Sequence, residues 1–436
     1  MYGKFPCRQC GAIVARLRVC LLGACLLFYA ELTSAQQGLT LQEASRRSVN
    51  NSPELQIFQW RLQAMEGLRQ TAGLRPQLGL GIRAENLLGT GEYSGTERAE
   101  YTLSLSSIIE LGGKRQSRLG VADSRYALAE IERRAQALDL LGRVTQRFVT
   151  VLALQEKLQL SQEATRLAGL LLQSVRQRVE QGATPDAERL RAQAALTQAE
   201  LAHSAIEAEL ASGKMSLATL WGADEVDFGA LSGDLYASQA ARDFDALFEQ
   251  VAASPAIQLL ATEARLRQAE LELVRSQSTS NLGWSFGVKQ LEESGDSAFT
   301  AGMEIPLFSG ARNKGDIKAA MAARTSVDYR KQASLLELRA RLYAAWRFHQ
   351  QAVAATQQLR QSVLPALEVA LVQTREAYER GRYRFVDLVD AQQELLHARL
   401  AAIDAASAAL LNQALIEQLT AEPLAAVDQS APASSE

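Results

Sequence analysis

The sequence is poor in the residues that most catalytic and metal-binding sites need. Only three of its 436 residues are histidine, and they are scattered through helix-forming stretches without an H-E-x-x-H motif: His203, His349 and His397. There is no P-loop, and a formal dinucleotide fingerprint, Gly79-x-Gly81-x-x-Ala84, lies inside an alternating stretch instead of between a strand and a helix. We therefore predict no enzyme activity, no cofactor and no metal site.

Cysteine is absent after residue 25, and no long apolar run follows the N-terminal segment. The four cysteines are Cys7, Cys10, Cys20 and Cys25. Basic residues precede an apolar run from Val19 to Ala30, and small residues follow up to Ala35, which predicts a signal peptide over residues 1–35. The run is about 12 residues, shorter than the roughly 20 of a membrane-spanning helix. The segment ending at Cys25 also resembles a lipoprotein cleavage box, so lipidation there stays an alternative.

Proline is scarce, and neither sign of charge dominates. Nine prolines leave very long stretches without a helix breaker, which favours few, long elements. The 46 Lys and Arg residues nearly balance the 49 Asp and Glu residues, for a net charge of −3. Because nucleic-acid binding depends on a basic surface, we expect no nucleic-acid partner.

One structural unit occurs twice, with a period near 200 residues. Ser52-Pro53-Glu54-Leu55 returns as Ser254-Pro255-Ala256-Ile257, and Gly182 matches Gly381. Each unit follows the order helix, strand, strand, helix, helix. We place the first repeat at residues 36–235 and the second at 236–424, and we expect the tail at 425–436 to be disordered.

Four stretches alternate between apolar and small or polar residues, at about 78–88, 100–110, 281–291 and 298–308. Their length of about 9 to 11 residues is that of a tilted strand crossing a bilayer. Apolar side chains facing lipid and polar ones facing water are typical of a membrane barrel. A half-buried sheet in a soluble domain is the alternative, and the signal peptide favours the membrane.

Long helical hairpins are predicted at 113–222 and 310–420. Apolar residues from Val121 to Leu138 step by three, four or seven, which is the seam spacing of a coiled coil. Gly182 and Pro185 mark the turn of the first hairpin and Gly381 that of the second, while Pro365 predicts a kink or break. Four strands leave two unpaired edges, so the chain must oligomerise; eight strands from two copies and twelve from three both stay open.

These landmarks carry a family resemblance. The duplicated unit, the Ser-Pro-Glu-Leu opening at Ser52, the link Ile109-Glu110-Leu111-Gly112-Gly113-Lys114-Arg115 and the turn from Gly381 to Asp390 resemble the TolC family of outer membrane efflux proteins, in particular its cobalt-zinc-cadmium branch. The resemblance implies a mainly helical homotrimer with a coiled-coil barrel and a twelve-strand β-barrel in outer-membrane lipid. It also implies a periplasmic adaptor and an inner-membrane pump of the resistance-nodulation-division class, with heavy-metal cations as cargo.

Three other functions stay open: a drug export channel or a protein export channel of the same family, and a periplasmic adaptor or scaffold that forms no channel. An adaptor is expected to have one hairpin flanked by many short strands, whereas this sequence repeats a unit with two strands.

The resemblance also points to a gate at the helical turns. The residues implied there are Asp387, Asp390, Glu188, Tyr378, Arg382 and Arg384. In a trimer Asp387 and Asp390, spaced i, i+3, are expected to form acidic rings, and like charges held close raise a carboxyl pKa. Tyr383 stands where a known family member has its bridging arginine. A simpler alternative is that Asp387 only caps the helix that follows.

Overall fold

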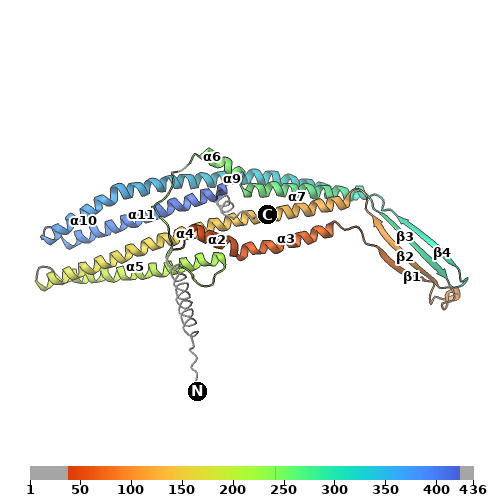
Figure 1. Cartoon of the computed structure of the whole chain (residues 1–436), viewed down its shortest axis with the longest axis horizontal. Coiled ribbons are helices and arrows are strands. Elements are labelled where there is room, and N and C mark those ends of the chain that lie inside the picture. Colours follow the sequence, from red (N-terminus) through yellow and green to blue (C-terminus); the bar gives the residue numbers. More distant parts are fainter. Residues whose placement is uncertain (1–37, 241, 423–436) are drawn as a thin grey trace, which may run out of the picture. The chain divides into compact units, whose positions relative to one another are not determined.

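The computed structural model describes residues 38–240 and 242–422 (Figure 1). The predicted signal peptide with its four cysteines and the predicted tail at 425–436 lie outside the described residues. Within them the chain is mainly helical and carries one four-stranded antiparallel sheet, as the sequence predicted.

Both halves have the predicted order of helix, strand, strand, helix, helix. The first contains α2 (Leu41–Asn51), α3 (Pro53–Ala72), β1 (Gly79–Glu85), η2 (Gly91–Tyr93), β2 (Glu100–Ile109), α4 (Lys114–Glu180), α5 (Asp186–Ala218) and η3 (Thr219–Trp221). The second contains α6 (Phe244–Ala252), α7 (Pro255–Gln277), β3 (Leu282–Leu291), β4 (Ser297–Glu304), α8 (Ser309–Arg312), α9 (Lys314–Gln358), η4 (Leu359–Val363), α10 (Leu364–Glu379) and α11 (Phe385–Thr420).

The chain forms two compact units that follow a different division from the two repeats. The first unit combines 144–238 and 353–410 with the segment that ends at Ser48. The second combines 49–143 and 239–352 with the residues from Leu411 on. Each unit therefore draws on both repeats, because the long helices α4, α9 and α11 each contribute to both units.

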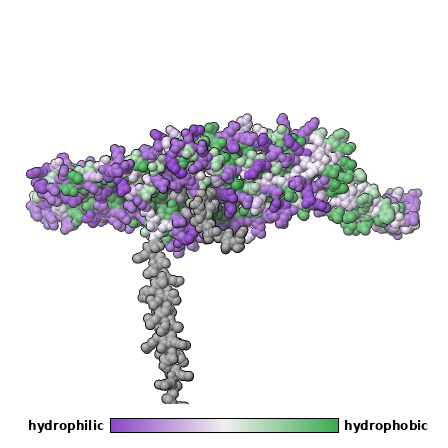
Figure 2. Space-filling view, turned by 45° about the horizontal axis from the view of Figure 1, so that its top comes forward, coloured by the Kyte–Doolittle hydropathy of each residue, from purple (hydrophilic) through white to green (hydrophobic). Residues whose placement is uncertain are grey.

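The sheet belongs to the second unit and has the strand order β1-β2-β3-β4. Its register puts Ile82 beside Leu103, Leu103 beside Val288, and Val288 beside Phe299. This apolar face is exposed, with Ile82 at 80% and Phe299 at 93% of full exposure, and Figure 2 shows hydrophobic residues over the strands. The opposite face carries small side chains: Gly81, Ser104, Gly287 and Thr300 form one row across it.

The strands are slightly shorter than predicted. β1 ends at Glu85 because Asn86 and Leu88 adopt left-handed φ values of 59° and 53°, which an extended strand does not contain. β4 ends at Glu304, two residues before Pro306, which has no N–H to donate to a ladder.

Two glycines turn the end of β2 into the start of α4. Gly112 and Gly113 have φ values of 75° and 71°, a conformation that L side chains rarely adopt. A side chain at Gly112 would also collide with Thr279, whose Oγ1 would lie 2.6 Å from the added Cβ. The following basic residues hold the junction, since Lys114 Nζ donates to Asn281 Oδ1 at 2.5 Å and Arg115 Nε donates to the carbonyl of Gly73 at 2.6 Å.

Pro365 coincides with a change of helix type. Residues Leu359–Val363 form a π-helical turn between α9 and α10. Proline cannot donate the i→i−4 bond and its ring crowds the carbonyl of residue 361, so the extra residue of a π turn relieves the clash. No such interruption occurs within the 67 residues of α4.

Among the described helices, α11 alone is long and apolar enough to cross a membrane by length and hydropathy, with a third of its most apolar window buried. Its apolar side chains pack in both units. Phe385, Leu388 and Leu395 belong to a cluster in the first unit, and Ile416 and Leu419 pack against α6 and α9 in the second. These contacts account for the buried part of the helix.

Candidate gate at the two helical turns

The turn between α4 and α5 is a Schellman cap centred on Gly182. Its N–H donates to the carbonyl of Val179 at 2.9 Å, and the N–H of Ala183 donates to the carbonyl of Arg178 at 2.9 Å. Both bonds satisfy carbonyls that the end of a helix leaves without partners. Gly182 has φ 69°, the left-handed conformation that this cap requires.

The turn between α10 and α11 repeats this geometry. Gly381 has φ 71°, its N–H donates to the carbonyl of Tyr378 at 2.9 Å, and the N–H of Arg382 donates to the carbonyl of Ala377 at 2.8 Å. The two turns predicted from Gly182 and Gly381 are therefore the same cap, built once in each repeat.

Asp387 caps the start of α11, as the simpler alternative predicted. Its Oδ2 accepts the N–H of Arg384 at 2.8 Å, and its Oδ1 lies 3.3 Å from Nη2 of the same residue. The backbone N–H and then the guanidinium of Arg384 favour the ionised carboxylate and lower the pKa of Asp387. The raised pKa expected for rings of Asp387 and Asp390 concerns several copies, and it stays a prediction.

The start of α5 has its own local contacts. Glu188 accepts from the hydroxyl of Thr184 at 3.1 Å, and Asp186 pairs with Arg189 through an N···O contact of 2.6 Å. The hydrogen bond from Arg189, followed by its charge, lowers the pKa of Asp186. These acidic groups stabilise the first turn of a helix, where N–H groups lack partners.

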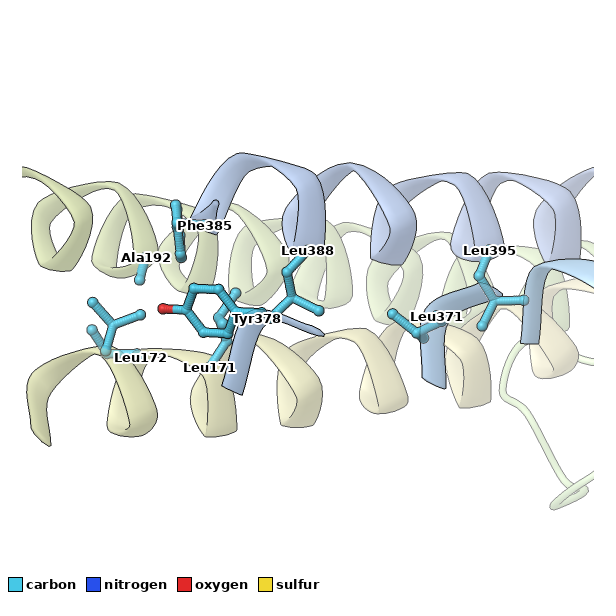
Figure 3. Close-up of a cluster of buried hydrophobic side chains, with 9 residues drawn as sticks. Leu171, Leu172, Ala192, Leu371, Tyr378, Phe385, Leu388 and Leu395 are labelled. Atoms are coloured by element: carbon cyan, nitrogen blue, oxygen red, sulfur yellow. The ribbon is translucent and has the colours of Figure 1, made fainter. Parts of the chain in front are cut away.

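An apolar cluster in the first unit lies next to the turns and joins four helices (Figure 3). It contains Leu171, Leu172, Val175, Ala192, Leu371, Tyr378, Phe385, Leu388 and Leu395. Tyr378 is only 4% exposed, and Figure 3 shows its hydroxyl directed toward Leu172 and Ala192. That hydroxyl has no hydrogen-bond partner among the described residues, and its burial, more than the charges around it, raises the pKa of Tyr378.

Arg178, which sequence reasoning missed, links the two turns. It lies in the last turn of α4, its guanidinium carbon is 4.5 Å from the centre of the Tyr378 ring, and Nη1 donates to the carbonyl of Tyr378 at 3.1 Å. The residues around Arg178 do not distinguish it from Arg176. The available signal was its distance from the turn, because it lies four residues before the capping glycine, Gly182.

The structure brings together only some of the predicted gate residues. Tyr378 and Glu188 are near enough for the Glu188 charge to act on the tyrosine, and Arg384 contacts Asp387. Asp390, Arg382 and Tyr383 are exposed on the second turn and the helix after it. Within residues 38–240 and 242–422, no group of three or more His, Asp or Glu side chains is arranged to hold a metal ion.

Comparison with known proteins finds similarity to outer membrane efflux proteins. A family model described as outer membrane efflux protein matches residues 44–223. The cobalt-zinc-cadmium resistance protein CzcC of Cupriavidus metallidurans is 27% identical over 362 residues, which cover 83% of this chain and 85% of that protein. The nickel-cobalt-cadmium resistance protein NccC of Alcaligenes xylosoxydans xylosoxydans is 27% identical over 259 residues, 59% of this chain and 58% of that protein.

The fold agrees with this match. Crystal structures of CusC, reported for its transmembrane channel formation, superpose with a TM-score of 0.72 at 16% identity, and the match covers 87% of this chain and 91% of CusC. The chain is therefore similar to outer membrane efflux proteins, resides in the outer membrane and resembles their heavy-metal resistance members.

Proposed function

We propose that three copies of this chain form an outer-membrane channel that passively conducts heavy-metal cations outward from a tripartite efflux system. The four-stranded sheet is the observation that carries the proposal. One face is apolar and exposed, the other is lined by small and polar side chains, and neither β1 nor β4 has a second strand partner within the described residues. Unpaired strand edges are not tolerated in hydrocarbon, so closure with other copies satisfies them; three copies give a barrel of twelve strands.

Exposed apolar stripes on two helices of the second unit support assembly with further copies. On α9, Tyr329, Leu336 and Tyr343 are more than half exposed and follow one another at intervals of seven. None of the 20 residues of α3 is buried, and its Trp60 is 71% exposed, whereas its counterpart α7 buries six residues. A second copy that packs on these faces would bury them.

The cargo and the partners are inferred from relatives and from the sequence. The relatives named for cobalt, zinc, cadmium and nickel resistance support metal cations as cargo. The sequence has no nucleotide-binding motif, so the energy for transport comes from a partner: an inner-membrane pump of the resistance-nodulation-division class, joined through a periplasmic adaptor. The channel itself has no catalytic role.

We assign the periplasmic gate to the two helical turns. Its residues are Asp387, Asp390, Glu188, Tyr378, Arg382 and Arg384, and the closely packed cluster around Tyr378 supports a closed arrangement there. Drug or protein export by the same channel remains the second candidate function. An adaptor or scaffold role is disfavoured by the exposed apolar sheet, which such a protein does not need.

Membrane fractionation tests the proposal first. The protein, extracted from outer membranes with detergent and run unboiled against boiled, should migrate as a heat-modifiable trimer. A soluble periplasmic monomer would overturn the channel. Deletion of the gene should then raise sensitivity to cobalt, zinc and cadmium salts, and complementation should restore resistance. If only drug sensitivity changes, the cargo assignment is wrong and the channel assignment stands.

A further inference from the structure

We propose that Arg178 clamps the two helical hairpins of one subunit together at the gate. In this proposal it acts through the ring and the backbone carbonyl of Tyr378, and the tyrosine hydroxyl is not the link. The inference rests on the proposed channel function and adds the residue that keeps the periplasmic end closed. Arg178 belongs to α4 and Tyr378 to α10, so the contact joins hairpins that lie 200 residues apart in the sequence.

Two interactions converge on one guanidinium. The cation lies over the face of the Tyr378 ring, where the ring quadrupole attracts it, at 4.5 Å from the centroid. Nη1 also donates at 3.1 Å to the carbonyl of Tyr378, which already accepts the N–H of Gly381 at 2.9 Å. That carbonyl belongs to the last turn of α10, where the helix dipole favours a cation. The guanidinium thus stabilises the cap of the second turn from a position on the first hairpin.

The hydroxyl of Tyr378 makes no comparable link. It is buried without a hydrogen-bond partner among the described residues. Glu188 is the acidic group whose charge acts on it, and the Glu188 carboxylate already accepts the Thr184 hydroxyl at 3.1 Å. A buried unpaired hydroxyl costs stability, so phenylalanine at this position retains the clamp and removes the cost.

The other basic residues near the turns bind locally. Arg384 pairs with Asp387 three residues away, Arg189 pairs with Asp186 three residues away, and Arg176 binds Gln193 within the same hairpin at 2.9 Å. These contacts stabilise single turns or a single hairpin, so they do not oppose separation of the two hairpins.

Two further ionic contacts join the hairpins of the first unit, and both lie far from the turns. Arg399 contacts Glu163 at 2.7 Å, and Lys157 contacts Asp404 at 2.7 Å. Glu163 precedes Arg178 by 15 residues on α4, about 22 Å along the helix. Among the charged contacts described between the two hairpins, that of Arg178 therefore lies nearest the turns, about four helical turns beyond Glu163. The apolar cluster packs the same region, and Arg178 adds a polar contact at its end.

Single-channel recording in planar bilayers tests the clamp. Arg178→Gln should raise the open probability of the purified channel about tenfold, because both contacts of the guanidinium are lost. Arg178→Lys keeps the charge and should restore part of the closure. Arg176→Gln, a matched change two residues away, should leave the conductance at the wild-type value. Heat-modifiable migration of every variant verifies that it folds and assembles.

Tyr378→Phe distinguishes the clamp from a bond through the hydroxyl. Phenylalanine keeps the aromatic ring and the backbone carbonyl that Arg178 contacts. The open probability of the Tyr378→Phe channel should therefore rise by less than a tenth of the rise seen in Arg178→Gln. If Tyr378→Phe opens the channel as much as Arg178→Gln, or if Arg178→Gln conducts like the wild type, the proposal is wrong.

Hydrogen exchange separates failure of the clamp from failure of the channel. The amides of Gly381 and Arg382 should exchange faster in Arg178→Gln than in Arg176→Gln, whether or not the protein conducts. If the wild type forms no channel but this difference is seen, the proposed function fails and the clamp stands. Equal exchange in both variants overturns the clamp.

Discussion

Gly182 and Gly381, which occupy equivalent places in the two repeats, have nearly equal left-handed φ values of 69° and 71° and close the same pair of backbone hydrogen bonds. No other atom lies within 4 Å of a Cβ added at either position. Both turns therefore depend on a backbone conformation and not on side-chain packing around the glycine.

Replacing either glycine should cost stability through backbone strain alone. We expect Gly182→Ala and Gly381→Ala to destabilise the protein by about 1–2 kcal/mol each, the cost of a left-handed L-residue. Gly169→Ala is the control, since Gly169 lies inside α4 with equally open surroundings and should stabilise by about 0.5–1 kcal/mol. Thermal unfolding in detergent measures the loss of stability in the two turn variants and the gain in Gly169→Ala. Equal shifts of the unfolding temperature in all three variants would contradict backbone strain as the cause.

The cap formed by Asp387 predicts a pH dependence of stability. Its pKa is lowered in the folded protein by the backbone N–H and guanidinium of Arg384, so the cap contributes fully above the unfolded pKa of about 3.9. As the pH falls through the lower folded pKa, the carboxylate is protonated and the contribution disappears. Asp387→Asn should therefore unfold at a lower temperature than the wild type at pH 7, and this difference should narrow progressively as the pH falls below about 4. A gap that stays constant down to pH 3 would mean that the ionised cap is not its cause.

A charged substitution should impair assembly at one residue of β2 and be tolerated at the next. Leu103 lies on the apolar face and Ser104 on the face with small side chains. Lysine on the lipid face costs about 2–4 kcal/mol near the bilayer midplane, so Leu103→Lys should reduce the heat-modifiable oligomer in outer membranes. Ser104→Lys should be assembled normally. If both variants assemble equally well, the apolar face does not contact lipid.

The two glycines after β2 should differ in their tolerance of a side chain. Both have positive φ, but only at Gly112 would a Cβ collide with Thr279; nothing lies within 4 Å at Gly113. Gly113→Ala should cost about 1–2 kcal/mol from strain, and Gly112→Ala should cost more. Thr279→Gly in the Gly112→Ala background removes the collision with Thr279 and should recover most of the excess, since the Ser276 carbonyl oxygen stays 3.2 Å from the added Cβ. Thermal midpoints of the three variants test this order.

The fold could be predicted from the sequence where one local signal sufficed. Period-two alternation located the four strands, and the recurring glycines located both turns, because each depends on residues close together in the chain. The end of β1 was missed because it depends on the conformations of Asn86 and Leu88, which alternation does not encode. Pro365 predicted a break, but a proline is compatible with either a kink or a break, and its position alone did not predict the π turn at 359–363 that accommodates it.

The two turns of the candidate site could be located from the sequence, whereas the contacts between them could not be predicted. Asp387 was correctly given a capping alternative, since its partner lies three residues away. Arg178 was missed because its partner, Tyr378, lies 200 residues away, and arginine is common throughout α4. Contacts between distant segments need the fold, and the contact of Arg178 with Tyr378 is of this kind.

The pairing of β2 with β3 joins the two repeats through ten residue pairs. These strands lie about 170 residues apart in the chain, whereas each strand hairpin and each helical hairpin is formed by residues close in sequence. At a synthesis rate of about 5–20 residues per second, β2 waits on the order of ten to thirty seconds for its partner to be made. A free, apolar strand edge is an aggregation hazard during that interval. The four-stranded sheet is therefore the element of this fold that most needs protection from aggregation, for example by a chaperone, while the chain is being made.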